Sequence, residues 1–294
     1  MTRLATPALR TFQSLWAMED LPTAAAPWTL EEQIGLLVQA GYAGVAVDLG
    51  ARRAPTAEAL ALALAGSGLE RMVFTFAGTT AALDEALDYA ARIEARDMVL
   101  CASVYPDEPR EAADLVAGWH ARAAAAGVHL ELETHRNTLT NDLRFTRRLV
   151  DELDPAVRLA IDLSHYIVGA EIPAEPTAEI EEKIAAILSR AGSLQGRIAS
   201  RCQVQIPLHH EGSQPWIALT RRWWRDGFAH LLAAREGAAR EEPVTFVTEL
   251  GTTPYALVDA DGVELSDRWA EARQLIEWAE ADLAAAARTV PLPA

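Results

Sequence analysis

Runs rich in branched and aromatic residues alternate with Ala- and Leu-rich runs along the whole chain. The strand-like runs lie at residues 11–18, 42–49, 71–78, 97–104, 128–135, 157–165, 197–206 and 244–250. A helix is expected after each, at residues 29–41, 56–69, 80–95, 108–127, 142–153, 175–192, 219–237 and 265–288. Strict alternation implies parallel strands with right-handed crossovers, and eight such units close a barrel. The sequence therefore predicts an α/β fold, a single (β/α)8 TIM barrel domain over residues 1–294.

Local signals agree with this assignment. Thr29 followed by Glu32 is the signature of a capping box, and Gly41 ends the same predicted helix. An open doubly wound sheet is the rival fold, but no G-x-G-x-x-G follows the first strand. The barrel is therefore the favoured architecture.

Charge and composition exclude several classes of protein. Half of the 294 residues are hydrophobic and 23% are charged, which excludes a largely disordered chain. A net charge of -16 repels phosphate backbones and anionic lipids, so we expect neither a nucleic-acid nor a membrane partner. The N-terminus lacks a signal-like apolar segment, which favours a cytoplasmic protein in which Cys101 and Cys202 are buried free thiols.

The stretch "HLELETHR" carries several acid-base groups on one strand. Alternation places His129, Glu131, Glu133 and His135 on the same face. Isolated buried carboxylates are very costly, so these groups need compensating charge or water. For the deeper Glu131, Arg158 or Arg201 could supply that charge.

Acidic residues end three of the expected strands. Glu133, Asp162 and Glu249 all fall at carboxyl ends, where the functional groups of such barrels lie. Three neighbouring carboxylates cannot all ionise without a compensating charge, and one divalent ion would supply it. An oxygen-rich set favours Mn²⁺ or Mg²⁺, with Zn²⁺, Co²⁺ or Fe²⁺ possible if a histidine joins.

Further polar and aromatic residues lie near the same ends. The expected seventh strand carries Arg201, Gln203 and Gln205 on one face. The candidates for substrate binding are His135, His165, Arg201, Gln205, His209, Trp16 and Trp216.

Four stretches, "TLEEQIGLLVQAGYAGVAVDL", "ELETH", "AIDLSHY" and "VTELGTTPY", resemble the xylose-isomerase-like barrel superfamily of sugar-phosphate isomerases and epimerases. The resemblance implies a metal held by Glu133, Asp162, a histidine on strand seven and Glu249, with His165 binding substrate. Strand seven departs from this pattern, because it reads "SRCQVQIPLHH". Either an amide oxygen of Gln203 or Gln205 replaces the imidazole, or His209 folds back into the pocket.

These residues together predict a metal-dependent isomerase or epimerase. The ion would stabilise an enediolate formed from a small sugar, polyol or related hydroxy-carbonyl compound, with Glu133 and Glu249 as the acid-base pair. A metabolite-binding barrel without catalysis is the main alternative, and a metal-dependent hydrolase or endonuclease is a weaker one. A homo-oligomer is possible.

Overall fold

Eight parallel strands form a closed barrel in the computed structural model, which describes residues 7–235 and 241–290. The barrel strands in chain order are β1 (Leu9–Ser14), β4 (Gly44–Asp48), β5 (Glu70–Ala77), β6 (Asp97–Ala102), β7 (His129–Glu133), β8 (Arg158–Ile161), β9 (Ala191–Gly196) and β10 (Val244–Thr248). Strand β1 pairs with both β4 and β10, which closes the barrel. The predicted (β/α)8 fold is confirmed.

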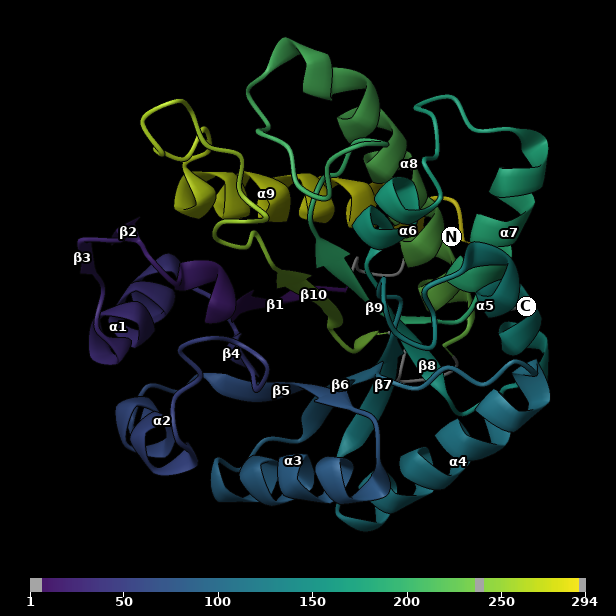
Figure 1. Ribbon diagram of the computed structural model, residues 1–294, viewed down its shortest axis with the longest axis horizontal. Helices are drawn as coiled ribbons and strands as arrows, with labels where there is room; N and C mark the ends of the chain where they lie inside the picture. Colours follow the sequence, from purple (N-terminus) through teal and green to yellow (C-terminus); the bar gives the residue numbers. More distant parts are fainter. Residues whose placement is uncertain (1–6, 236–240, 291–294) are drawn as a thin grey trace.

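Helices surround the barrel strands (Figure 1). They are α1 (Leu30–Ala40), α2 (Ala57–Leu64), α3 (Thr80–Arg92), α4 (Pro109–Ala125), α5 (Leu143–Glu152), α6 (Leu163–Gly169), α7 (Ala178–Leu188), α8 (Gln214–Ala233) and α9 (Arg268–Ala287). A short hairpin of β2 (Pro22–Thr23) and β3 (Ala26–Pro27), which the sequence did not predict, lies between β1 and α1. No helix in the described ranges is both long enough and apolar enough to cross a membrane.

The start and end of α1 show how local sequence sets the helices. The Thr29 hydroxyl accepts from the Glu32 amide, and the Glu32 carboxylate accepts from the Thr29 amide at 2.8 Å. Gly41 ends the helix in the left-handed region at φ 77°, which glycine adopts without steric cost. The predicted capping box is therefore confirmed.

The seventh barrel strand differs from the prediction. It runs over Ala191–Gly196, whereas residues 197–206 form the loop that follows it. The segment AGSLQG has few strand-forming residues, because packing against neighbouring side chains requires glycine at two of its positions. A Cβ on Gly192 would lie 2.2 Å from the Glu131 Oε1 atom, and one on Gly196 would lie 2.9 Å from the Phe246 ring. Small residues are required at both positions, so the strand carries a weak local signal.

Two other boundaries also differ from the prediction. Strand β8 ends at Ile161, and Asp162 caps α6 by accepting from the Ser164 amide at 2.8 Å, so His165 lies on a helix. Helix α8 begins at Gln214, which places Trp216 in a helix. The predicted helix 219–237 extends beyond the described residues after position 235.

Inside the barrel, a small apolar cluster lies apart from the main core between strands and helices. Its members are Phe12, Ala46, Met72, Phe74, Val99, Ala160 and Val247. Gly44 makes room for this cluster, because a Cβ there would lie 2.2 Å from the Phe12 ring and 2.9 Å from the Glu70 carbonyl oxygen.

Replacing Gly44 with alanine should lower the free energy of unfolding by about 1–3 kcal/mol, since the added methyl group overpacks the barrel. Urea denaturation would measure the change. The control is Gly35→Ala on α1, where a Cβ meets nothing within 4 Å, and which should be neutral or slightly stabilising. Equal stability of the two variants would contradict this account of the packing.

Candidate active site

Acidic side chains converge at the carboxyl ends of the barrel strands. Asp48 ends β4, Glu133 ends β7, Asp162 follows β8 and Glu249 follows β10. Ligand oxygens of Glu133, Asp162 and Glu249 all lie within 4.8 Å of one another. The structure thus brings together the three acids that the sequence singled out, and it adds Asp48. Asp48 could have been found by the same strand-end rule applied to "VAVDL".

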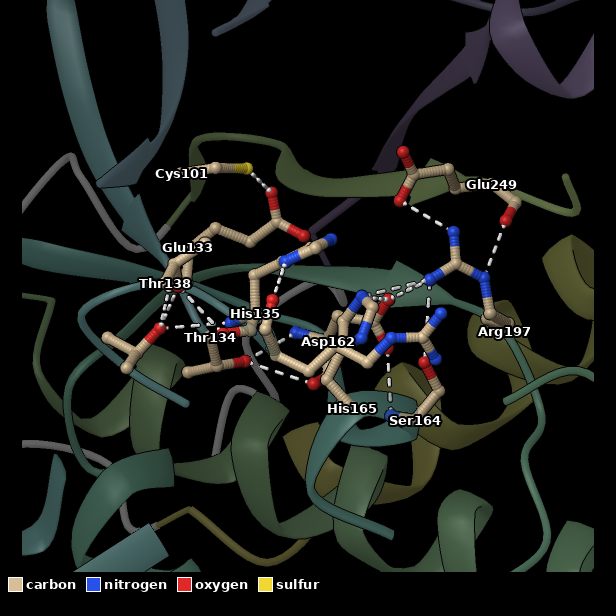
Figure 2. A network of polar contacts seen from close by, with 12 residues as sticks. Cys101, Glu133, Thr134, His135, Thr138, Asp162, Ser164, His165, Arg197 and Glu249 are labelled. Carbon is tan, nitrogen blue, oxygen red and sulfur yellow. Dashed lines mark hydrogen bonds and ion pairs between the residues drawn. The ribbon is translucent and has the colours of Figure 1, made fainter. Parts of the chain in front are cut away.

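Arg197 follows β9 directly and reaches Asp162 and Glu249 (Figure 2). Its Nη1 atom lies 2.6 Å from Asp162 Oδ2, and its Nη2 atom lies 3.0 Å from Glu249 Oε2. Its Nε atom donates to the Glu249 carbonyl oxygen at 2.9 Å. The side chain is almost fully buried, with 1% exposed. The guanidinium is therefore an internal counter-charge for two of the three carboxylates.

Arg197 is absent from the predicted site residues, because the seventh strand was expected to begin at Arg197 and to end at Ile206, whereas it ends at Gly196. Once the strand ends at Gly196, Arg197 falls at the carboxyl end of the barrel, where functional groups lie. A basic residue at position 197 is visible in the sequence. Its place in the site could be recognised only once β9 is known to end at Gly196, and the glycines of β9 hide that strand end.

Burial and charge shift the pKa values of this group. Burial raises the pKa of Glu249 to about 8, against the lowering effect of Arg197. Burial, with the nearby Glu249 charge, also raises the pKa of Glu133 well above its usual range. Burial acts to lower the pKa of Arg197, but Asp162 and Glu249 together raise it above its ordinary value. The site thus combines a permanent cation with carboxyl groups that are weakly acidic.

Glu133 has a different neighbour from the other two acids. The Cys101 thiol donates to Glu133 Oε2 at 2.7 Å, and burial raises the pKa of that thiol well above its usual range. Cys101 is a buried free thiol, as predicted, whereas Cys202 is an exposed one. Glu133 therefore receives a neutral hydrogen bond, while Glu249 receives an ionic one.

Two imidazoles lie against each other, with their planes tilted by 46°, beside the acids. The ring centroids of His135 and His165 are 3.9 Å apart, and His165 Nε2 lies 3.2 Å from Arg197 Nη1. Burial lowers the pKa of His135 to about 4 and lowers the pKa of His165 well below its usual value. Both rings are therefore neutral near pH 7, and each can accept as well as donate a hydrogen bond.

A small cavity of about 50 Å³ opens onto the cluster. Its lining combines three of the acids with Arg197 and aromatic rings, and consists of Trp16, Asp48, Phe74, Phe76, Cys101, Glu133, His135, Arg197, Glu249 and Tyr255. The rings of Trp16 and Tyr255 meet edge to face at 4.9 Å. Trp16 and His135, both predicted to bind substrate, line this cavity.

Gln205 lies near this region but not on a strand. It is buried, and its amide nitrogen donates to the Gly251 carbonyl oxygen at 3.0 Å, in the loop that follows β10. Gln203 is exposed, and its side-chain oxygen accepts from the Ser200 hydroxyl at 2.6 Å. The strand alternation that pointed both amides into the barrel does not exist at these positions.

Three other candidates make contacts away from the acids. Arg201 is exposed and pairs with Glu171 at 3.5 Å, and His209 is exposed with its Nδ1 atom 3.5 Å from Glu271. Trp216 is half-buried on α8 and packs against the main core. Their placement after β9 explains the difference, because the loop carries them outward from the short strand.

The deeper Glu131 belongs to another layer. The Ser193 hydroxyl donates to Glu131 Oε2, and Gly192 leaves space for the carboxylate. Burial raises the pKa of Glu131, while the charges of His129 and Arg158 act to lower it. Of the two arginines proposed as its partner, Arg158 is the one beside it.

Two groups of described side chains are close enough to hold a metal ion. They are Glu133 with Asp162 and Glu249, and Glu133 with His135 and His165. The first group, as arranged, does not fit a divalent ion, because the Arg197 guanidinium contacts two of its three carboxylates. Two unit charges about 4 Å apart interact by about 4 kcal/mol at an effective dielectric constant near 20, and a divalent ion doubles that repulsion.

Comparison with known proteins identifies solved structures with the same fold. No protein-family model matches the chain, and no curated protein matches it. Among solved structures, an L-ribulose 3-epimerase covers 95% of the chain and 96% of its own length at 14% identity, with a TM-score of 0.59. A xylose isomerase-like TIM barrel protein from Mycobacterium smegmatis in complex with magnesium covers 95% and 98% at 14% identity, with a TM-score of 0.58.

The chain has the fold of the xylose isomerase-like TIM barrels. A D-allulose 3-epimerase from Methylomonas sp. in complex with D-allulose also shares it, at 15% identity over 94% of this chain and 97% of that one, with a TM-score of 0.53. The predicted resemblance is thus confirmed at the level of fold. Identities this low show the architecture alone, so the site residues must be argued from their own geometry.

Asp48 offers a test of the site's electrostatics. Burial raises its pKa to about 6, so its folded-state pKa lies above the unfolded value of 3.8. A raised carboxyl pKa favours folding below the unfolded pKa, and that contribution is lost as pH rises towards 6. Asp48→Asn should therefore gain stability relative to the parent protein by about 2 kcal/mol between pH 4.5 and pH 7.5.

Urea denaturation of both proteins at each pH would measure this gain. Asparagine keeps an oxygen that can accept from the Gly50 amide, which lies 2.7 Å from Asp48 Oδ1. A difference between the two proteins that is constant with pH would show that Asp48 titrates normally.

Proposed function

We propose that the protein is an isomerase or epimerase that transfers a proton at a carbon next to the carbonyl group of a small hydroxy-carbonyl compound. The observation that carries this proposal is the pair Glu133 and Glu249, two buried carboxyl groups with raised pKa values at one small cavity. A carboxyl group that titrates near neutral pH can both accept and return a proton. Ordinary surface carboxylates are too weakly basic for this.

The different neighbours of the two glutamates suggest their roles. Glu249 contacts the Arg197 cation at 3.0 Å, which favours its ionised form relative to that of Glu133, so Glu249 loses its proton first and is the base. Among the described side chains, the Glu133 carboxylate accepts a hydrogen bond only from the neutral Cys101 thiol, which leaves Glu133 as the acid. A protonated Glu133 would donate to the substrate carbonyl oxygen while Glu249 takes the proton from the adjacent carbon.

The surroundings of the glutamates suit a polyhydroxylated substrate. The neutral His135 and His165 can exchange hydrogen bonds with hydroxyl groups, and Trp16 with Tyr255 offers apolar surface to the C–H face of a sugar. The names of the L-ribulose and D-allulose 3-epimerases that share the fold are consistent with such a substrate. The fold suggests a divalent metal, but no step of this proposal uses one.

Proton exchange in D₂O would test the proposal before the substrate is identified. A panel of ketoses, aldoses, inosose-like polyols and keto acids is incubated with the protein, and deuterium incorporation is followed by mass spectrometry. Glu249→Gln and Glu133→Gln should each lower the exchange rate of an active compound by about 10²-fold or more, because each removes one proton-transfer group.

The matched control for both variants is Glu131→Gln. Glu131 lies on β7 two residues before Glu133, but its carboxylate accepts from Ser193 in a deeper layer. This variant should keep an exchange rate within about threefold of the parent protein. Full activity in Glu249→Gln would contradict the proposed roles.

A metabolite-binding barrel without catalysis is the second candidate. The contact of Arg197 with two of the three acids favours it, since a guanidinium that holds Asp162 and Glu249 can serve a static binding site. Saturable binding of a panel compound by calorimetry, with no deuterium incorporation into it, would decide for this function.

A further inference from the structure

We infer that the guanidinium of Arg197 takes the place of the divalent cation that this fold suggests, so that the acidic cluster binds no metal in the native protein. This exchange of one cation for another concerns the charge balance of the site, and it is independent of which reaction the site performs. This would explain why strand seven lacks the histidine ligand that the resemblance implies, because the Arg197 cation lies at the end of that strand.

The position of Arg197 is the first argument. The resemblance to xylose-isomerase-like barrels implies a ligand from strand seven, and Arg197 is the first residue after β9. An arginine is always protonated in proteins and cannot act as a metal ligand. The side chain is buried, so solvent screens its charge within the cluster only weakly.

The contacts of the acids are the second argument. Asp162 Oδ1 accepts from the Ser164 amide at 2.8 Å, and Asp162 Oδ2 lies 2.6 Å from Arg197. Glu249 Oε2 lies 3.0 Å from the same guanidinium. A metal ion bound by both acids would have to displace the guanidinium or lie beside it. Displacement breaks the ion pairs of Arg197, and a position beside it brings like charges together.

The anchoring of Arg197 is the third argument. Its Nε atom donates to the Glu249 carbonyl oxygen at 2.9 Å, and its charged group faces the rings of Tyr255 and Trp16 at 5.1 and 5.6 Å from their centroids. The backbone hydrogen bond and the two cation-π contacts fix the side chain independently of the carboxylates. The guanidinium is therefore built into the site and is not a mobile side chain that an ion could push aside.

Metal analysis of the whole protein, purified without chelator or affinity nickel, would test the inference directly. We expect less than about 0.1 equivalents of Mn, Mg, Zn, Co or Fe per chain. We also expect no saturable binding of Mn²⁺ by calorimetry up to 1 mM, and an unfolding temperature unchanged by EDTA. About one ion per chain, bound by the parent protein and lost in Asp162→Asn, would overturn the inference, because Asp162 belongs only to the group that contacts Arg197.

Substitution of the arginine provides the complementary test. Arg197→His removes the charge and offers an imidazole at the strand-seven position, so Mn²⁺ should bind at least tenfold more tightly than to the parent protein and should raise the unfolding temperature. Arg197→Lys keeps the positive charge and should bind no better than the parent. A folded Arg197→His variant that gains no Mn²⁺ affinity would show that the arginine does not stand in for a metal.

Arg201→His is the control for adding a histidine to the same loop. Arg201 is exposed and pairs with Glu171, so this variant should gain no Mn²⁺ affinity. If Arg197→His does not fold, the metal content and Mn²⁺ binding of the parent protein decide the question alone. Neither measurement uses turnover, so a failure of the proposed proton transfer would leave these results unchanged.

Discussion

The ion pairs of Arg197 with Asp162 and Glu249 are the interaction on which the carboxyl end of the barrel depends. Four acids meet there, and buried carboxylates without a counter-charge are strongly destabilising. The guanidinium also bonds to the Glu249 backbone, so one side chain links the ends of β8, β9 and β10. Arg197 therefore both neutralises the acids and connects the strand ends.

This arrangement divides the acids into two kinds. Asp162 and Glu249 share a cation, whereas Glu133 has a thiol partner and a more strongly disfavoured charge. Unequal surroundings give neighbouring carboxyl groups unequal acidities, which is the condition for one to act as acid while the other acts as base. The neutral histidines beside them add hydrogen-bonding groups without altering the net charge.

Much of the fold and part of the site could be predicted because the relevant signals are local or repeat with a fixed period. The alternation of strands and helices indicated the barrel, and the strand-end rule found Glu133, Asp162 and Glu249. The rule failed where the strand itself was not recognised. Gly192 and Gly196 lower the strand signal of β9 because Glu131 and Phe246 need the space, and neither neighbour is close in sequence.

The sequence by itself determined the architecture and the concentration of acids at one end of the barrel, because both follow from strand periodicity and parallel packing. Only the tertiary structure decided which cation meets those acids. The end of β9 brings Arg197 to Asp162 and Glu249 and carries Arg201, Gln203 and His209 into the loop beyond. The earlier end of one strand changes the group that neutralises the site, because neutralisation depends on distances of about 3 Å between distant parts of the chain.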